Sequence, residues 1–322
     1  MAAPTPSPAG PVVVVGGANV DVKARSTRPP VLGSSNPGTT RSSPGGVGRN
    51  VAENLARLTT PVTLVAHIGE DEAGERLLRT TAAAGVDVSA VVRGPFPTGA
   101  YTAVLDHAGE LVVAVSEMTG TDALGVADVR EREAVLAGAA LVVVDGNLPA
   151  AVAAAALDIA AAAGVPAVVD PVSAPKAARL RPVLQGRSLR ALTPDRGELA
   201  AVTGIDTATE ADLHRAVAAA HARGCELVWV RLGAGGSLLS TGDGRPARFP
   251  AAPGPVLDVT GAGDAMLAAF VHALLEGHDP VTAVHHGHAA AGLTVATADT
   301  VRADLTPEVL ADALDAYLGS LP

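Results

Sequence analysis

The stretch Asp258-Val259-Thr260-Gly261-Ala262-Gly263-Asp264 leads directly into an apolar segment that begins at Ala265. A glycine-rich turn that opens a helix directs several backbone N–H groups, and the positive end of the helix dipole, toward one point. Such a point suits an anion such as a phosphate group. An acid just after the turn is well placed to accept a proton from a hydroxyl that attacks the phosphate. The stretch therefore favours a small-molecule kinase.

The same stretch has a simpler interpretation. Gly261 and Gly263 would then serve only a loop with positive φ angles, and Asp264 would only stabilise the helix N-terminus electrostatically. Short glycine motifs recur by chance, so the remaining sequence has to decide between the two interpretations.

Composition limits the class of protein. The chain has 322 residues, enough for one large α/β domain or two ordinary ones, and with three Phe, two Tyr and one Trp its core must be aliphatic. The single cysteine, Cys225, excludes an intramolecular disulfide and a cysteine metal cluster, fits a reduced cytoplasm, and is expected to be a small core residue. No apolar run reaches membrane-spanning length, and residues 1–10 are expected to be a loose tail rather than a signal peptide.

Charge and glycine spacing exclude several functions. A formal net charge of −10 disfavours attachment to nucleic acid or to acidic membranes. Neither lysine, Lys23 or Lys176, lies in a P-loop motif. Val51 and Leu238 stand where a dinucleotide-binding G-x-G-x-x-G motif requires its last glycine, which weakens a nicotinamide oxidoreductase as an alternative.

Short apolar runs alternate with alanine-rich segments, a pattern typical of a parallel sheet covered by helices on both faces. The sequence therefore predicts a doubly wound α/β core and a single domain over residues 11–322. The predicted strands are Val12–Val15, Val62–His67, Leu141–Val144, Ala167–Val169, Leu189–Leu192 and Leu227–Leu232. The predicted helices are Ala52–Leu58, Gly74–Ala84, Ala150–Ala163, Ala208–Ala222, one after Asp264, Pro280–Val295 and Pro307–Leu318.

Two regions interrupt the alternation. Tyr101–Asp106 and Glu110–Ser116 have the pattern of a β-hairpin, and Val20–Leu32 is extended without a following helix. We expect these regions, about 18–34 and 95–118, to form a small sheet that covers the open edge of the core as a lid.

Polar and glycine residues follow the predicted strands, where ligands of open α/β sheets bind. Together they suit a hydroxyl-rich ligand and a phosphate-bearing one, although an ordinary turn explains Asp145 and Asp170 better when each is taken alone. The segments are Gly16 to Asp21, Asp145 to Asn147, Asp170, Thr193 to Glu198 and Gly233 to Gly236.

With these features in order, the chain resembles the ribokinase-type carbohydrate kinases of the phosphofructokinase-B superfamily. Residues 258–264 match the C-terminal signature with valine in the second place, and Gly45-Gly46-Val47-Gly48-Arg49-Asn50 matches the N-terminal one. Within the superfamily, residues 16–23, 35–38 and 43–58 are most similar to pseudouridine kinases. The resemblance implies a ribokinase-like fold and ATP-dependent phosphorylation of the 5′-hydroxyl of pseudouridine. Alternatives are a ribokinase or another nucleoside kinase, and a catalytically silent ligand-binding regulator, which the presence of Asp264 disfavours.

The resemblance also implies roles for individual residues. Asp264 would be the catalytic base, and the N–H groups of Gly261, Ala262 and Gly263 would form the anion hole. Because Asn19 and Asp21 alternate along an extended segment, we expect a twist or bulge to bring both to one ligand. Discrimination of the base is expected among Lys23, Ser35, Asn36, Arg49 and Asn50. The expected substrate-binding residues are Asn19, Asp21, Lys23, Gly45, Gly46, Arg49, Asn50, Asn147 and Asp264.

ATP would bind beyond the later strands. Glu198 would support Mg²⁺ through water, whereas Asp195 departs from the family's Asn-x-x-Glu pattern, which puts its direct contact in doubt. Asp258 and Thr260 would either border a K⁺ site or hold the turn in shape. A homodimer is implied as well. The expected nucleotide-binding residues are Thr193, Asp195, Glu198, Gly233, Gly235, Gly236, Gly261, Gly263 and His288.

Three histidines, His285, His286 and His288, invite a metal site. Positions 285 and 288 share a helix face, but no third ligand follows at a useful spacing. Surface or pocket-wall histidines are therefore the favoured interpretation.

Overall fold

One large sheet has the strand order β14-β13-β12-β11-β10-β9-β1-β4 in the computed structural model, which describes residues 10–321. The expected loose tail at residues 1–10 lies, apart from Gly10, outside the described residues. The strands from β12 to β4 run parallel, and β13 and β14 are antiparallel additions. The bounds are β1 Val12–Val15, β4 Val62–Val65, β9 Leu141–Asp145, β10 Ala167–Asp170, β11 Leu189–Leu192, β12 Cys225–Arg231, β13 Ser237–Ser240 and β14 Ala247–Phe249.

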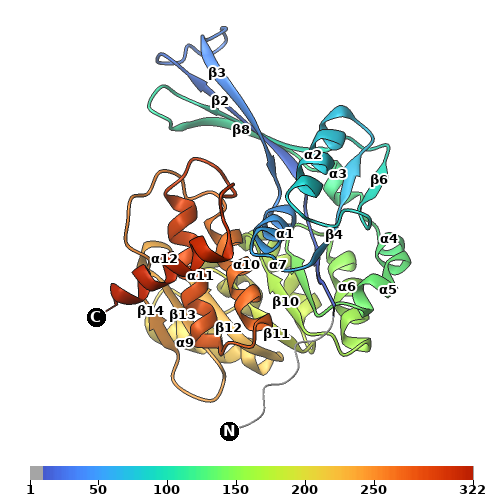
Figure 1. Cartoon of the computed structure of the whole chain (residues 1–322), viewed down its shortest axis with the longest axis vertical. Helices are drawn as coiled ribbons and strands as arrows, with labels where there is room; N and C mark the ends of the chain where they lie inside the picture. Colours follow the sequence, from blue (N-terminus) through green and yellow to red (C-terminus); the bar gives the residue numbers. More distant parts are fainter. Residues whose placement is uncertain (1–9, 322) are drawn as a thin grey trace.

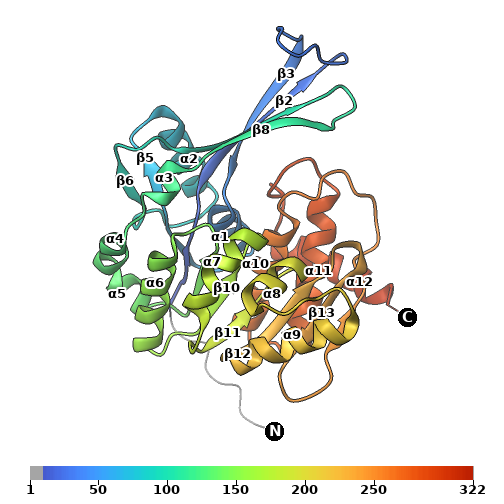
Figure 2. The same cartoon turned by 180° about the vertical axis from the view of Figure 1, so that it is seen from behind.

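Helices cover both faces of this sheet, which confirms the doubly wound core (Figures 1 and 2). Successive residues of β1 alternate between two cores, with Val13 and Val15 in one and Val12 and Val14 in the other. The first core is closed by α6 Ala150–Ala162, α7 Ala174–Leu184, α8 Arg196–Thr203 and α9 Glu210–Ala222. The second is closed by α1 Val47–Arg57, α10 Ala262–Leu275 and α11 Pro280–Val295, and α12 Pro307–Gly319 packs against α11.

A second, four-stranded sheet projects from the core in the order β3-β2-β7-β8 (Figure 1). The predicted hairpin is confirmed as β7 Gly99–Leu105 and β8 Leu111–Glu117. The predicted extension to Leu32 is wrong, because β2 Asn19–Ser26 ends at Ser26. β3 Gly38–Gly45 was not predicted, since its exposed, polar residues lack the apolar alternation of a half-buried strand.

Smaller elements lie beside the base of this sheet and at the edge of the core. The predicted strand Val62–His67 is wrong at its end, because His67 begins β5 His67–Gly69, which pairs with β6 Val92–Gly94 in a separate sheet. Helix α1 begins at Val47 rather than at Ala52. The remaining helices are α2 Glu72–Ala83, α3 Thr119–Asp122, α4 Val126–Glu131 and α5 Glu133–Ala137. Among residues 10–321, no helix is both long and apolar enough to span a membrane.

Candidate active site

Two neighbouring cavities meet at Asp264. The first, of about 590 Å³, lies beyond the ends of β10 and β12 and against α10 and α11. The second, of about 520 Å³, lies between the core and the base of the four-stranded sheet. Asp264, Val47 and Val172 line both cavities. A group carried by a ligand in one cavity can therefore approach a ligand in the other at this carboxylate.

The glycine turn occupies the junction. Gly261, at the N-terminal boundary of α10, has a φ of 80° and lines the second cavity, while Ala262 and Gly263 line the first. A side chain at Gly261 would come within 2.0 Å of the Thr300 carbonyl oxygen, so this position requires glycine. One of the three expected anion-hole donors is engaged, since the Ala262 N–H donates to the Val259 carbonyl at 3.3 Å.

The carboxyl group of Asp264 is held by one amide and has an altered acidity. Asn50 Nδ2 donates to Asp264 Oδ2 at 2.8 Å. Burial, the largest cause, raises the pKa of Asp264 to about 7, and the charges of Asp170 and Asp145 act in the same direction. The Asn50 hydrogen bond and the positive charge of Arg231 oppose this rise. A carboxyl group with a pKa near neutrality is a stronger base than an ordinary aspartate once it is ionised.

This acidity predicts how activity depends on pH. Only the ionised form of Asp264 can accept a proton, and a pKa raised to about 7 means that ionisation is lost as the pH falls through neutrality. We expect kcat/KM to rise with pH and to level off above an apparent pKa of about 7. Initial rates measured from about pH 5.5 to 8.5 test this expectation, and a flat profile over that range would contradict it.

Arg49 orients the amide that holds Asp264. Its side chain is buried, with Nη2 at 2.7 Å and Nε at 3.2 Å from Asn50 Oδ1, and Nη1 at 2.5 Å from Glu53. With its oxygen engaged, Asn50 presents its amide NH₂ to Asp264. Arg49 does not line either cavity, so the structure gives this expected substrate-binding residue a positioning role instead.

The second cavity brings together most of the expected substrate-binding residues: Asn19, Asp21, Gly46, Asn50, Asn147 and Asp264. Asn19 Nδ2 donates to Asp21 Oδ1 at 2.8 Å, so the expected twist or bulge is unnecessary. Residues two apart in a strand share a face, which is why both reach the cavity from β2. Gly45 is not at the wall but lies against Asp21, where a side chain would come within 2.4 Å of its carboxylate.

Besides Arg49 and Gly45, three further residues expected to contact or select the substrate do not line this cavity. Lys23 pairs with Asp258 instead. Ser35 is exposed, and Asn36 bonds the backbone of Val31, in the connection between β2 and β3. These three residues were expected at the substrate because their region resembles that of pseudouridine kinases. Such a resemblance does not show how far β2 and β3 extend away from the core.

Other residues of the second cavity were not predicted as substrate-binding. Lys176 lines the cavity and donates to Asn147 Oδ1. Asp145 does not line it but accepts hydrogen bonds from the N–H groups of Gly17 and Asn147, which is the turn-supporting role favoured by its sequence context. Burial lowers the pKa of Lys176, while the charge of Asp145 opposes this shift. Further lining residues include Tyr101, Ser116, Met118, Thr121, Asp122 and Arg179.

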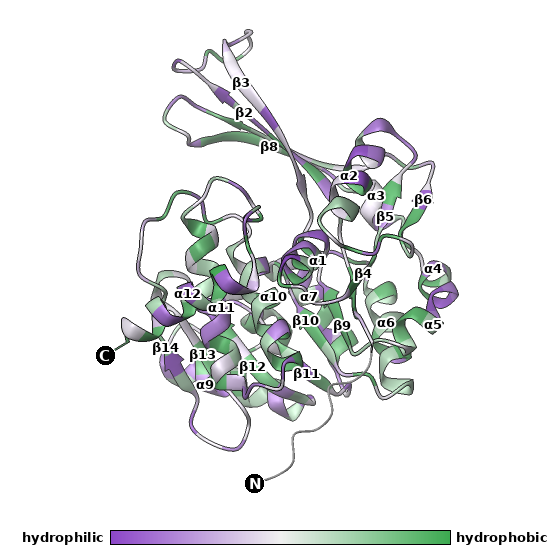
Figure 3. Cartoon of the chain, in the orientation of Figure 1, coloured by the Kyte–Doolittle hydropathy of each residue, from purple (hydrophilic) through white to green (hydrophobic). Residues whose placement is uncertain are grey.

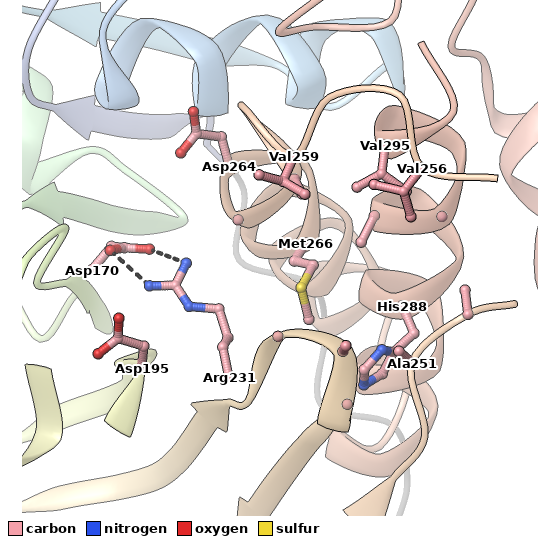
Figure 4. A pocket seen from close by; sticks show the side chains of 18 of the residues that line it. Asp170, Asp195, Arg231, Ala251, Val256, Val259, Asp264, Met266, His288 and Val295 are labelled. Carbon is pink, nitrogen blue, oxygen red and sulfur yellow. Dashed lines mark hydrogen bonds and ion pairs between the residues drawn. The ribbon is translucent and has the colours of Figure 1, made fainter. Parts of the chain in front are cut away.

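The first cavity contains a buried group of charges (Figure 4). Arg231, at the end of β12, forms a two-point ion pair with Asp170 at 2.9 and 3.1 Å and approaches Glu198 at 3.4 Å. Burial, the largest cause, raises the pKa of Glu198 to about 7. Asp195 and Glu198 also cap α8 reciprocally, each side chain accepting the other's backbone N–H. Arg231 was not expected at the site from the sequence, because a single arginine at the end of a strand belongs to no recognisable motif.

The opposite wall of the first cavity is apolar. In Figure 4, Val256, Val259 and Val295 face the cavity across from Asp170 and Arg231. Val256 and Val259 are mostly exposed, at 64% and 69%. Large apolar side chains at the rim of a cavity are suited to cover a flat ring.

The remaining expected nucleotide-binding residues divide between wall and interior. Gly233, Gly236 and His288 line the first cavity, whereas Gly235 and Thr193 do not, and Thr193 is fully buried. His288 shares a hydrogen bond of 2.7 Å with Ser237 Oγ, and burial lowers its pKa to about 4, so it is neutral. Within residues 10–321 no three histidine, cysteine or acidic side chains converge as a metal site, and Cys225 is buried as expected.

A family model for the pfkB family carbohydrate kinases matches residues 10–306, and the chain belongs to this family. It is therefore a phosphotransferase that acts on a hydroxyl group of a sugar or nucleoside. The chain is 32% identical to the pseudouridine kinase of Escherichia coli (strain K12) over 92% of its own length and 93% of that protein. It is 31% identical to the ribokinase of Arabidopsis thaliana over 89% of its length and 76% of that protein.

Solved structures agree with this membership. The structure of Arabidopsis thaliana ribokinase complexed with ribose and ATP has a TM-score of 0.82 at 27% identity, covering 95% of this chain and 99% of that one. A carbohydrate kinase from Agrobacterium tumefaciens has a TM-score of 0.81 at 29% identity, covering 97% and 98%. The predicted ribokinase-like fold is thus confirmed.

Proposed function

We propose that the chain transfers the γ-phosphoryl group of ATP to the 5′-hydroxyl of pseudouridine. One observation carries the proposal: Asp264 lines both an apolar-walled cavity and a polar one. ATP would occupy the first cavity, with its adenine ring against Val256 and Val259 and its phosphates toward the glycine turn. The nucleoside would occupy the second, with its 5′-hydroxyl at Asp264. Supporting the choice of nucleoside is the 32% identity with a pseudouridine kinase over nearly the whole chain.

The proposed reaction uses the chain's own groups in a simple order. Asn19 and Asp21 bind ribose hydroxyls as donor and acceptor. Asp264 accepts the proton of the 5′-hydroxyl while the 5′-oxygen of the nucleoside attacks the γ-phosphorus of ATP. The bond between the γ-phosphorus and the oxygen bridging to the β-phosphate breaks, and ADP leaves with that oxygen. The N–H groups of the glycine turn stabilise the charge on the transferring group.

Magnesium is part of the proposal. The oxygen donors Asp170, Asp195 and Glu198 line the first cavity and suit a hard cation. All three are engaged with Arg231 or with backbone in this structure, which fits an ion held mainly by phosphate oxygens and water. Mg²⁺ would neutralise phosphate charge there, with Glu198 contacting its water.

The four-stranded sheet is proposed to act as a lid, because Tyr101, Ser116 and Met118 bring its hairpin region to the wall of the second cavity. We also propose a homodimer formed through this sheet. Its edge strand β8 is apolar (Figure 3). It is also exposed to solvent, with Leu111 57%, Val113 52% and Val115 64% exposed. A particle mass of one chain, 31.8 kDa, in light scattering would overturn the dimer.

Substrate choice tests the proposed function. Pseudouridine has one ring N–H more than uridine, and a buried hydrogen bond left unmade costs about 1–3 kcal/mol. We expect kcat/KM for pseudouridine to exceed that for uridine by roughly ten- to a hundredfold. The two values, measured with MgATP alongside ribose, adenosine and fructose 6-phosphate, decide the matter. Equal values, or a preference for ribose, would contradict pseudouridine as the substrate and leave the kinase class intact.

A further inference from the structure

Lys23 connects the small sheet to the glycine turn. It lies on β2, and its Nζ is 2.8 Å from Oδ2 of Asp258, a residue 235 positions away in the loop before α10. The two side chains are 34% and 29% exposed, so this pair is partly shielded from solvent. An ion pair that joins two separate parts of the fold in this way can fix one relative to the other.

Asp258 in turn shapes the turn itself. Its second oxygen, Oδ1, accepts hydrogen bonds from the backbone N–H of Thr260 at 2.8 Å and from the Thr260 hydroxyl at 2.6 Å. Burial raises the pKa of Asp258, but the hydrogen bonds from Lys23 and Thr260 outweigh this effect and leave the pKa lowered. Asp258 is thus held as a carboxylate that fixes the backbone immediately before Gly261.

A K⁺ ion does not fit at Asp258 as the residues stand. Hard cations require several free oxygen ligands. Here Oδ1 already accepts from Thr260, and Oδ2 already accepts from a positively charged ammonium group. The Lys23 ammonium carries the same single charge as a monovalent cation and is attached to the chain.

We propose that Lys23 is a tethered cation that organises the glycine turn, so that the turn does not depend on a monovalent metal ion. Through the same contact, the position of the small sheet is coupled to the glycine turn, whose N–H groups stabilise the transferring phosphoryl group. Lys23 acts through Asp258 and Thr260 and is a positioning residue. This inference rests on the proposed kinase function for its activity readout, but its structural readout is independent of any substrate.

A second ion pair provides a matched control. Arg41, on β3, lies 3.7 Å from Asp299 and also links the small sheet to the core. Both side chains are mostly exposed, at 75% and 63%, and exposed pairs contribute little. Arg41→Ala therefore removes a cationic side chain from the same sheet without touching Asp258.

The structural test is hydrogen exchange of residues 256–263 in a buffer whose only monovalent cation is tetramethylammonium. We expect exchange in this segment to be faster in Lys23→Met than in the native chain, to be slowed again by added K⁺ or NH₄⁺, and to be unchanged in Arg41→Ala. Native exchange should not respond to K⁺. Unchanged exchange in Lys23→Met, or a native segment that K⁺ slows, would overturn the proposal whatever the substrate is.

The activity test uses the same proteins with pseudouridine and MgATP. In tetramethylammonium we expect Lys23→Met to lose about tenfold or more in kcat. K⁺ or NH₄⁺ should restore much of this loss, and Lys23→Arg should retain activity without them. A native enzyme that requires K⁺ would overturn the proposal, as would a fully active Lys23→Met in tetramethylammonium. Inactivity of every protein toward pseudouridine would instead count against the proposed substrate, and the exchange experiment would still decide the role of Lys23.

Discussion

Asp264→Asn is expected to lower kcat by at least about a hundredfold, because a lost general base costs this much or more. The amide keeps nearly the shape of the carboxylate but does not accept the proton of the attacking hydroxyl. Most of the first cavity is unaffected, since its carboxylates and apolar wall come from other residues. Steady-state rates together with calorimetric binding of ATP measure both expectations.

A carboxylate on the wall of the same cavity provides the control. Asp122 lines the second cavity, and Asp122→Asn makes the same chemical change there. Its kcat should fall far less than that of Asp264→Asn. If Asp264→Asn turned over at nearly the native rate, Asp264 would have no part in proton transfer.

The second large effect is expected for Gly261→Ala. The φ of 80° disfavours a side chain, and a Cβ at this position would lie 2.0 Å from the Thr300 carbonyl oxygen, which is backbone. The turn has to shift, and its N–H groups then lose their alignment with the transferring phosphoryl group. We expect kcat/KM to fall about a hundredfold or more, the cost of a lost oxyanion-hole donor.

Gly277→Ala is the matched control, because Gly277 lies just beyond the other end of α10. It has a φ of 85°, but no heavy atom lies within 4 Å of a Cβ placed there. This change should cost about 1 kcal/mol of stability through backbone strain alone and leave kcat/KM near the native value. Comparable losses of activity in the two variants, at similar melting temperatures, would contradict a specific role for the glycine turn.

Much of the core was predictable because local pattern and tertiary environment agree there. Val12–Val15 forms a strand with the predicted bounds, since a strand buried on both faces leaves a continuous apolar run. Leu189–Leu192 also has the predicted bounds, although Arg190 interrupts its apolar run. The glycine turn was predictable too, because the positive φ of Gly261 favours glycine. Asn50 and Asp264 were each expected at the site, and they meet although 214 residues separate them.

Features that depend on long-range contacts were not predictable. Arg231 pairs with Asp170, 61 residues away, and Lys23 pairs with Asp258, 235 residues away. The sequence around Arg231 or Lys23 does not indicate which residue each of them will contact. Arg49 was expected to touch substrate because it lies in the region most similar to pseudouridine kinases, but its buried side chain contacts Asn50 and Glu53 instead. Strand β3 is polar and exposed, so only its pairing with β2 defines it.

Phosphorus NMR of the reaction of the chain with MgATP and pseudouridine tests the central claim most directly. If the two cavities bring an ATP phosphoryl group and a nucleoside hydroxyl together at Asp264, ADP and a phosphomonoester should appear in equal amounts. The phosphorus signal of the phosphomonoester should be split by coupling to the two 5′ protons of the ribose. Inorganic phosphate as the only new signal besides ADP would contradict the claim. So would persistence of ATP with pseudouridine, uridine, ribose, adenosine and fructose 6-phosphate alike.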